Sequence, residues 1–213
     1  MLLAASVCPH PPLLVPEVAA GAAAELDDLR NAARAAVAAL APHDVVVVGA
    51  APETRPYDGV PDLAAYLGRT PATDALPLAL AVGRWLAPHA RCHGIAAGAT
   101  PAEAAALGAR LAADDVALLV MGDGSARRDP KAPGYVDPRA EPYDAAVARA
   151  LRDGDAAALL ALDPADDDAL LVAGRAAWQV LAGAAGDGAW TGDVTYDAAP
   201  YGVGYLVATW TRA

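Results

Sequence analysis

The stretch DVVVVGA, residues 44–50, decides which fold this sequence can adopt. Four successive valines leave the stretch without a polar face, and β-branched side chains favour an extended backbone. A strand that is apolar on both sides has to be covered on both sides, which is the usual situation of a central parallel strand. The stretch therefore predicts a buried strand in the middle of a sheet.

Outward from this strand, apolar runs alternate with helical patterns. Further strands are predicted at Leu2–Cys8, Arg91–Ala97, Val116–Met121, Trp190–Tyr196 and Val203–Trp210. Helices are predicted at Val18–Leu40, Pro101–Ala113, Tyr143–Arg152, Asp155–Leu162 and Asp166–Ala182, whereas Leu76–Ala87 fits a helix or a strand. Ala51–Thr73 is expected to be an ordered loop with a short helix. The alternation predicts one α/β domain over residues 1–213, with a mostly parallel or mixed sheet and helices on both faces.

The clearest helix start lies after the Arg91–Ala97 strand. Thr100 is a good capping residue, Pro101 suits the first helical position, and Glu103 stands where a capping box needs it. The acidic group around Asp166–Asp168 lacks the glycine and the closing glutamate of an EF-hand loop. We therefore interpret it as the acid-rich first turn of a helix.

The composition reports mainly on the genome. The chain is 56% hydrophobic but only 5% aromatic, it contains no Phe, and alanine supplies most of the apolar fraction. Residues with GC-rich codons are abundant, and there is a single Lys, Lys131, and a single Ile, Ile95. We infer a bacterial source of high GC content.

Charge and hydropathy exclude several classes of function. The 26 acidic and 15 basic residues give a net charge of -11, which would repel a phosphate backbone, so no nucleic-acid partner is expected. No apolar run reaches the roughly 20 residues of a membrane helix, and the apolar N-terminus lacks a basic region. Two cysteines, Cys8 and Cys92, make no disulfide framework. A cytoplasmic protein without a membrane partner is predicted, and its alanine-rich faces fit a homodimer.

Three predicted strands end in polar sequence, and ligands of α/β proteins bind beyond the carboxyl ends of strands. If the three strands are parallel neighbours, their loops converge on one edge of the sheet. The predicted pocket then contains His10, Glu53, Arg55, Asp123, Ser125, Arg127 and Arg128. We expect it to take a small aromatic or anionic molecule.

Three stretches give the sequence a resemblance to a known family: PHPPLLVPEV (residues 9–18), DVVVVGA (44–50) and PYGVGYLVATW (200–210). In this order they resemble the class III extradiol dioxygenase superfamily. Its members include the catalytic B subunit of aromatic ring-opening dioxygenases and the Memo-like proteins. The resemblance covers most of the chain, its most specific part is the PHPP after the first strand, and it points to a divergent actinobacterial branch.

The resemblance implies a metal site. Members of the family hold non-haem iron(II) with two histidines and a carboxylate, which leaves coordination positions open for catechol and O2, and a further histidine serves as acid and base. His10 matches the first ligand. Pro52 occupies the position of the second histidine, and Ala126 occupies that of the acid–base histidine. The late ligand would fall near Tyr201. The resemblance thus implies Fe2+ or Zn2+ at His10, in a site that is largely degraded.

Each of these residues also has a structural interpretation. His10 fits a metal ligand, a general base or a residue that caps the proline loop. Cys8 lies on the same face as His10, so the two could bind a metal together, or Cys8 is a buried small hydrophobic residue. Asp123 fits a ligand, an orienting group or an acceptor for loop N–H groups. Ser125 fits a nucleophile or a turn, although its surroundings, GDGSA, are not G-x-S-x-G. Arg127 and Arg128 fit an anion site or local ion pairs.

Three functions follow from these alternatives. The first is a divergent extradiol dioxygenase-like protein that binds a small ligand, with Glu53, Arg55, Arg127 and Tyr201 as binding residues, or that catalyses altered chemistry through Asp123 and Ser125. The second is a non-catalytic scaffold of the Memo-like type that keeps the fold only. The third is a hydrolase that depends on Ser125.

Overall fold

The centre of the molecule is the strand β5 (Val116–Met121), of which all six residues are buried. In the computed structural model, which describes residues 1–213, β5 lies between two parallel neighbours, β1 (Leu2–Cys8) and β2 (Val45–Ala51). Alternate residues of β5 point to opposite faces. Leu118 and Val120 belong to one hydrophobic cluster, and Leu119 and Met121 belong to the other. The sheet is therefore covered on both faces, as the valine run predicts.

The sheet is mixed and has seven strands in the order β3-β4-β2-β5-β1-β7-β6. The remaining strands are β3 (Arg55–Tyr57), β4 (Arg91–Ala96), β6 (Trp190–Ala198) and β7 (Tyr205–Arg212). The four strands β4, β2, β5 and β1 run parallel, whereas β3, β7 and β6 pair antiparallel with their neighbours. The predicted α/β fold with a mixed sheet is confirmed.

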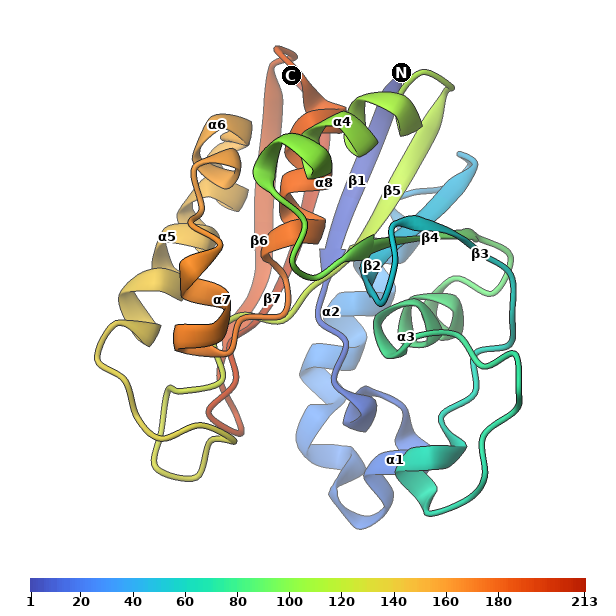
Figure 1. Cartoon of the computed structure of the whole chain (residues 1–213), viewed down its shortest axis with the longest axis vertical. Coiled ribbons are helices and arrows are strands. Elements are labelled where there is room, and N and C mark those ends of the chain that lie inside the picture. Colours follow the sequence, from blue (N-terminus) through green and yellow to red (C-terminus); the bar gives the residue numbers. More distant parts are fainter.

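Helices cover both faces of the sheet (Figure 1). The helices are α1 (Pro16–Ala19), α2 (Asp27–Ala38), α3 (Leu78–Leu86), α4 (Pro101–Leu111), α5 (Ala140–Asp153), α6 (Ala156–Leu160), α7 (Ala165–Leu170) and α8 (Arg175–Ala185). One face packs against α2 and α3, and the other packs against α4, α5, α6 and α8. None of them combines the length and apolar character that crossing a membrane requires.

Several predicted elements are present with small shifts at their ends. The ambiguous stretch Leu76–Ala87 forms the helix α3, and the capping box of Thr100 and Glu103 is formed at the start of α4. Within the predicted loop Ala51–Thr73, the edge strand β3 is an addition that the sequence did not reveal.

Two helices predicted as continuous are interrupted. Val18–Leu40 is split because Ala20 has a positive φ of 48°, and a 3-10 segment, Ala20–Leu26, precedes α2. Asp166–Ala182 is split into α7 and α8 because Leu171 has a positive φ of 55°. Both breaks occur in apolar sequence, where helix propensity alone favours continuation.

The helices α4 and α8 pack closely because small residues lie between them. A Cβ atom on Gly108 would lie 2.0 Å from the carbonyl oxygen of Val180, and one on Gly183 would lie 2.3 Å from that of Ala105. The two helix backbones are thus close enough that only glycine fits at these positions. Small side chains take the place that Phe and Ile hold in other cores.

We predict that Gly183→Ala destabilises the protein by about 1–3 kcal/mol, because the added methyl group overlaps the backbone of Ala105 and the helices must separate. Gly21→Ala is the matched control, since a Cβ atom there meets nothing within 4 Å. Urea unfolding of both variants measures the difference. Equal stability of the two variants would contradict the close crossing of α4 and α8.

Candidate functional site

The parallel strands β1, β2, β4 and β5 all end at the same edge of the sheet. The loops after β1 and β5 are neighbours there, since the backbone N–H of Gly122 donates to the carbonyl oxygen of Cys8 at 2.9 Å. The antiparallel β7 begins at this edge, so the turn before it, residues 199–204, joins the same group of loops. The sequence-predicted residues divide into three separate groups, two at this edge and one at the edge strand β3.

His10 and Asp123 form the first group. The backbone N–H of His10 donates to Oδ1 of Asp123 at 2.7 Å, and Nδ1 of the ring lies 3.5 Å from the same oxygen without forming a hydrogen bond. Both side chains are largely buried. Burial raises the pKa of Asp123 above its ordinary 3.8, while the nearby His10 ring and backbone N–H act in the opposite direction. Asp123 therefore fixes the proline loop after β1.

Ser125 belongs to a second group, built around a buried carboxylate that the sequence did not single out, Asp144 on α5. The backbone N–H and the hydroxyl of Ser125 donate to the two oxygens of Asp144, each at 2.8 Å. Gly124 and Gly204 lie against this carboxylate, because a Cβ atom would stand 2.6 Å and 2.3 Å from its oxygens. Burial raises the pKa of Asp144, and the hydrogen bonds from Ser125 oppose that change.

This geometry favours the interpretation of Ser125 as a residue that stabilises a turn over its interpretation as a nucleophile. The residue is fully buried, and its hydroxyl proton is directed to Asp144. No histidine takes part in the interaction. A substrate would have to displace the α5 contact to reach the oxygen.

The neighbouring arginines are also held in place. Arg128 lies 3.5 Å from Asp144 and 3.6 Å from Glu141, in the ion pairs that the structural interpretation expects. The Nε atom of Arg127 is buried without a hydrogen-bond partner. Tyr201 turns away from this group, since its hydroxyl donates to the Glu25 carboxylate at 3.0 Å. Desolvation raises the pKa of Tyr201, and the hydrogen bond to the Glu25 carboxylate raises it further.

Glu53 and Arg55 form a third group at the far side of the sheet. They are exposed and pair with each other at 3.1 Å. Arg55 lies on β3, four strand positions from β1, which corresponds to about 19 Å at the usual strand spacing. The expectation of one pocket holding all seven residues is thus wrong, because the chain after β2 crosses the end of β4 to form an edge strand. None of the cavities is lined by His10 or Asp123.

The residues present do not fit the metal that the family resemblance implies. No three His, Cys, Asp or Glu side chains come together in a group that could hold a metal ion. Pro52 is exposed and Ala126 is buried at the two substituted positions, and neither offers a donor atom. Cys8 gives no third ligand, because its thiol is buried against the carbonyl oxygen of Ala33 and burial raises its pKa to about 12.

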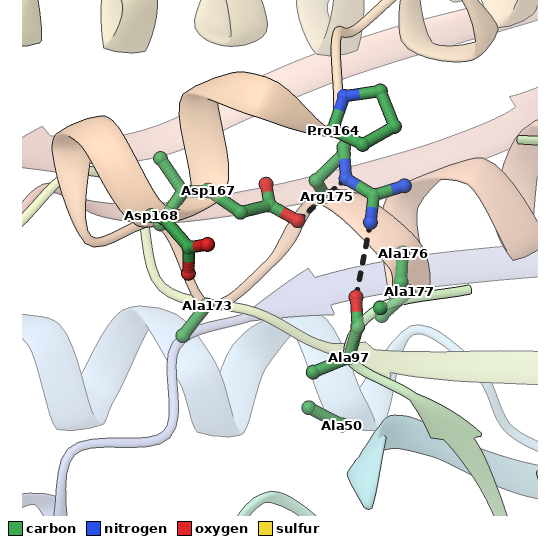
Figure 2. A pocket seen from close by; sticks show the side chains of 11 residues that line it. Ala50, Ala97, Pro164, Asp167, Asp168, Ala173, Arg175, Ala176 and Ala177 are labelled. Atoms are coloured by element: carbon green, nitrogen blue, oxygen red, sulfur yellow. Dashed lines mark hydrogen bonds and ion pairs between the residues drawn. The ribbon is translucent and has the colours of Figure 1, made fainter. Parts of the chain in front are cut away.

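A pocket of about 200 Å³ lies over the ends of β2 and β4 (Figure 2). Its floor is formed by Ala50, Ala97 and Gly98, and α7 and the start of α8 cover it. The walls are mostly apolar, and the polar groups are Asp167, Asp168 and Arg175. This is the position at which α/β proteins usually bind small molecules.

Arg175 is fully buried and holds the pocket together. Its Nε donates to Asp167 at 2.6 Å, and its terminal nitrogens donate to the carbonyl oxygens of Ala97 and Ala99 and to the side chain of Gln179. The guanidinium thereby ties α8 to the chain that leaves β4. One carboxylate oxygen of Asp167 accepts from Arg175, while the other, Oδ1, is buried without a partner. Burial raises the pKa of Asp167, and Arg175 opposes that change.

Buried polar atoms without partners gather around these loops. They are His10 Nδ1, Arg127 Nε, Tyr143 Oη, Asp167 Oδ1 and Trp178 Nε1, whereas a sixth, Arg84 Nε, lies elsewhere. Trp178 packs against Gly122 and Gly174, where added Cβ atoms would clash with its ring. Such atoms are rare in folded proteins, so their concentration marks the carboxyl edge as the place where ligands or water complete the structure.

Sequence reasoning missed this pocket because it depends on the break between α7 and α8. The turn at Leu171 lets the backbone N–H of Ala173 donate to the carbonyl oxygen of Asp123, and the carbonyl oxygen of Leu170 accept from the backbone N–H of Ala126. The only available signal was the short GRAA segment after Val172, in which Gly174 marks a possible interruption.

The fold and the site define a single α/β domain with a seven-stranded mixed sheet and a ligand-sized pocket at its carboxyl edge. No protein-family model matches the chain, and no curated protein matches it in sequence. Among solved structures, it is similar to that titled "Crystal structure of uncharacterized protein JW3007 from Escherichia coli K12". The two chains are 17% identical, the match covers 98% of this chain and 99% of the other, and the TM-score is 0.56. At this identity the similarity shows the fold alone.

The raised pKa of Asp123 predicts a pH dependence of stability. The folded state holds the Asp123 proton more tightly than the unfolded state does, so this contribution is present below about pH 4 and is lost as the pH rises through the folded-state pKa. Asp123→Asn keeps an acceptor for the His10 N–H but cannot ionise. We expect wild-type stability relative to this variant to fall as the pH rises above about pH 4 and through the folded-state pKa.

Urea unfolding at a series of pH values checks this expectation. Asp187→Asn, which removes an exposed carboxylate, serves as the control and is expected to follow the wild type. Parallel curves for the wild type and Asp123→Asn, or a difference of opposite sign, would contradict the assignment.

Proposed function

We propose that this protein is a divergent member of the class III extradiol dioxygenase superfamily that binds a small molecule and does not open aromatic rings with iron. The motifs at residues 9–18, 44–50 and 200–210 support the family assignment. The loss of donor atoms at Pro52 and Ala126 supports the absence of iron chemistry, since His10 and Asp123 alone offer too few ligands.

One observation carries the binding part of the proposal. The pocket over β2 and β4 contains a carboxylate oxygen, Asp167 Oδ1, that is buried and has no hydrogen-bond partner. A buried acceptor of this kind costs free energy unless a donor reaches it. Arg175 cannot supply that donor, because its Nε is already directed to the other oxygen. In the proposed complex the partly exposed Asp167 side chain shifts so that this oxygen accepts from a hydroxyl group of the bound molecule.

The pocket walls indicate the class of ligand. Alanine, valine and proline side chains suit an apolar body, and Asp167 and Asp168 suit hydroxyl donors. Arg175 is neutralised by Asp167, which makes an anionic ligand less suitable here than a neutral one. A hydroxylated ring such as catechol combines these properties and fits a volume of about 200 Å³.

We predict that catechol binds one site per chain in isothermal titration calorimetry. Ala173→Leu is expected to abolish binding because the larger side chain fills the pocket, and Ala35→Leu, the same change on the exposed face of α2, is expected to leave binding intact. Asp167→Asn is expected to weaken binding at least about tenfold. Equal binding by Ala173→Leu and wild type would place the ligand elsewhere and contradict the proposal.

We further predict that the purified protein contains no stoichiometric iron or zinc and that catechol causes no O2 uptake. Elemental analysis and an oxygen electrode measure these two quantities, with iron(II) added to the assay in a second experiment. Iron bound at one equivalent per chain, together with catechol-dependent O2 uptake, would overturn the absence of ring-opening chemistry.

The Memo-like scaffold function is favoured by a separate observation. His10 and Asp123 are closed onto each other and line no cavity, so the inherited catalytic position offers no room for a substrate. The titration separates the two candidates. Binding that is lost in Ala173→Leu supports the ligand-binding protein, and no binding by wild type supports the scaffold.

A further inference from the structure

A second cavity lies at the opposite end of β4, far from the pocket described above. It has a volume of about 600 Å³, the largest in the molecule, and it is bordered by the edge strand β3, the start of β4 and the end of α3. Its lining residues include Arg55, Arg84, Arg91 and His89, against a single carboxylate, Asp58. Three of the 15 basic residues thus gather in one cavity of a chain with net charge -11.

The register of the strands explains this gathering. Tyr57 is paired with Cys92 and Arg55 with Gly94, so the side chains of Arg55, Tyr57 and Cys92 share one face of the edge ladder. The same face packs against α3, whose last turn carries Arg84. The Arg55 guanidinium lies over the Tyr57 ring at 3.9 Å, which fixes its plane at the border of the cavity.

The three arginines differ in their present partners. Arg55 pairs with Glu53 at 3.1 Å and Arg91 with Asp44 at 2.6 Å, and all four of these side chains are more than half exposed. Exposed pairs of this kind contribute little stability, so an incoming anion can compete for both guanidinium groups.

Arg84 is different, because it takes part in no ion pair and its Nε is buried without a hydrogen-bond partner. It lies beside the Cys92 thiol, where it opposes the increase in the thiol pKa that burial causes. Arg84 carries no carboxylate partner and lines the same cavity as two further guanidinium groups, so the cavity offers several charged donors to an anion. The planar fork of each arginine matches the oxygens of a phosphate group, which can accept from several donors at once.

We propose that this cavity, the basic cavity of Arg55, Arg84 and Arg91, binds a phosphate-type dianion, either inorganic phosphate or the phosphate group of a small metabolite. Arg84 forms the centre of the site, and Arg55 and Arg91 close on the anion from the two strands. The site is independent of the catechol-sized pocket, which lies beyond the other end of β4.

Isothermal titration with inorganic phosphate at constant ionic strength tests the proposal, with acetate as the monoanionic comparison and phenyl phosphate as the organic one. We expect phosphate to bind and acetate not to bind. Tighter binding of phenyl phosphate than of inorganic phosphate would identify a phosphomonoester as the ligand, and equal binding would identify the free anion.

Arg84→Gln is expected to weaken phosphate binding at least about tenfold. Arg84→Lys keeps the positive charge but loses the planar guanidinium group that donates two parallel hydrogen bonds, and it is expected to weaken binding less. Arg149→Gln is the matched control, because it removes the same charge from an exposed position on α5. Phosphate is also expected to raise the melting temperature of the wild type and of Arg149→Gln, but not of Arg84→Gln.

Equal weakening by Arg84→Gln and Arg149→Gln would show a general effect of net charge and overturn the site. If Arg84→Gln does not fold, Arg84→Lys and the double variant Arg55→Gln/Arg91→Gln decide the question. Unchanged phosphate affinity in both of these would also overturn the proposal. Neither result depends on whether catechol binds.

Discussion

The burial of β5 and β2 on both faces is the constraint on which the rest of the structure depends. No side of these strands can face water, so helices must cover both faces and the chain must cross from one face to the other between parallel strands. With few large side chains available, close contact is reached by bringing backbones together, as at Gly108 and Gly183 between α4 and α8. This packing sets where the parallel strands end and therefore where the loops of the carboxyl edge begin.

Two buried polar side chains then determine how those loops are arranged. Asp144 binds the turn of Gly124 and Ser125 and lies against the chain at Gly204, which brings three distant segments together. Arg175 does the same for α8 and the chain after β4 through the carbonyl oxygens of Ala97 and Ala99. Both groups direct their hydrogen bonds to the inside of the fold. The unpaired polar atoms are left around the loops at the edge, where a ligand can reach them.

The two proposed sites use the charge of the molecule in opposite ways. At the carboxyl edge, Arg175 is neutralised by Asp167, and the pocket offers acceptors to a neutral hydroxylated ligand. At the other end of β4, Arg84 lacks a carboxylate partner in a molecule that is strongly acidic overall, and the cavity offers donors to an anion. His10 and Asp123 lie against each other through the His10 backbone N–H, and no cavity opens onto them.

The sequence by itself determined the strands of the parallel core, the capping box at Thr100 and the α/β class, because each rests on local apolar pattern or on contacts three residues apart. It also brought attention to His10 and Asp123, since loops after adjacent parallel strands must meet. The tertiary structure alone decided the break at Leu171, the crossing of the chain to β3, and the roles of Asp144, Asp167 and Arg175. These depend on hydrogen bonds between residues far apart in the chain, such as those from Arg175 to Ala97 and Ala99, which no local pattern specifies.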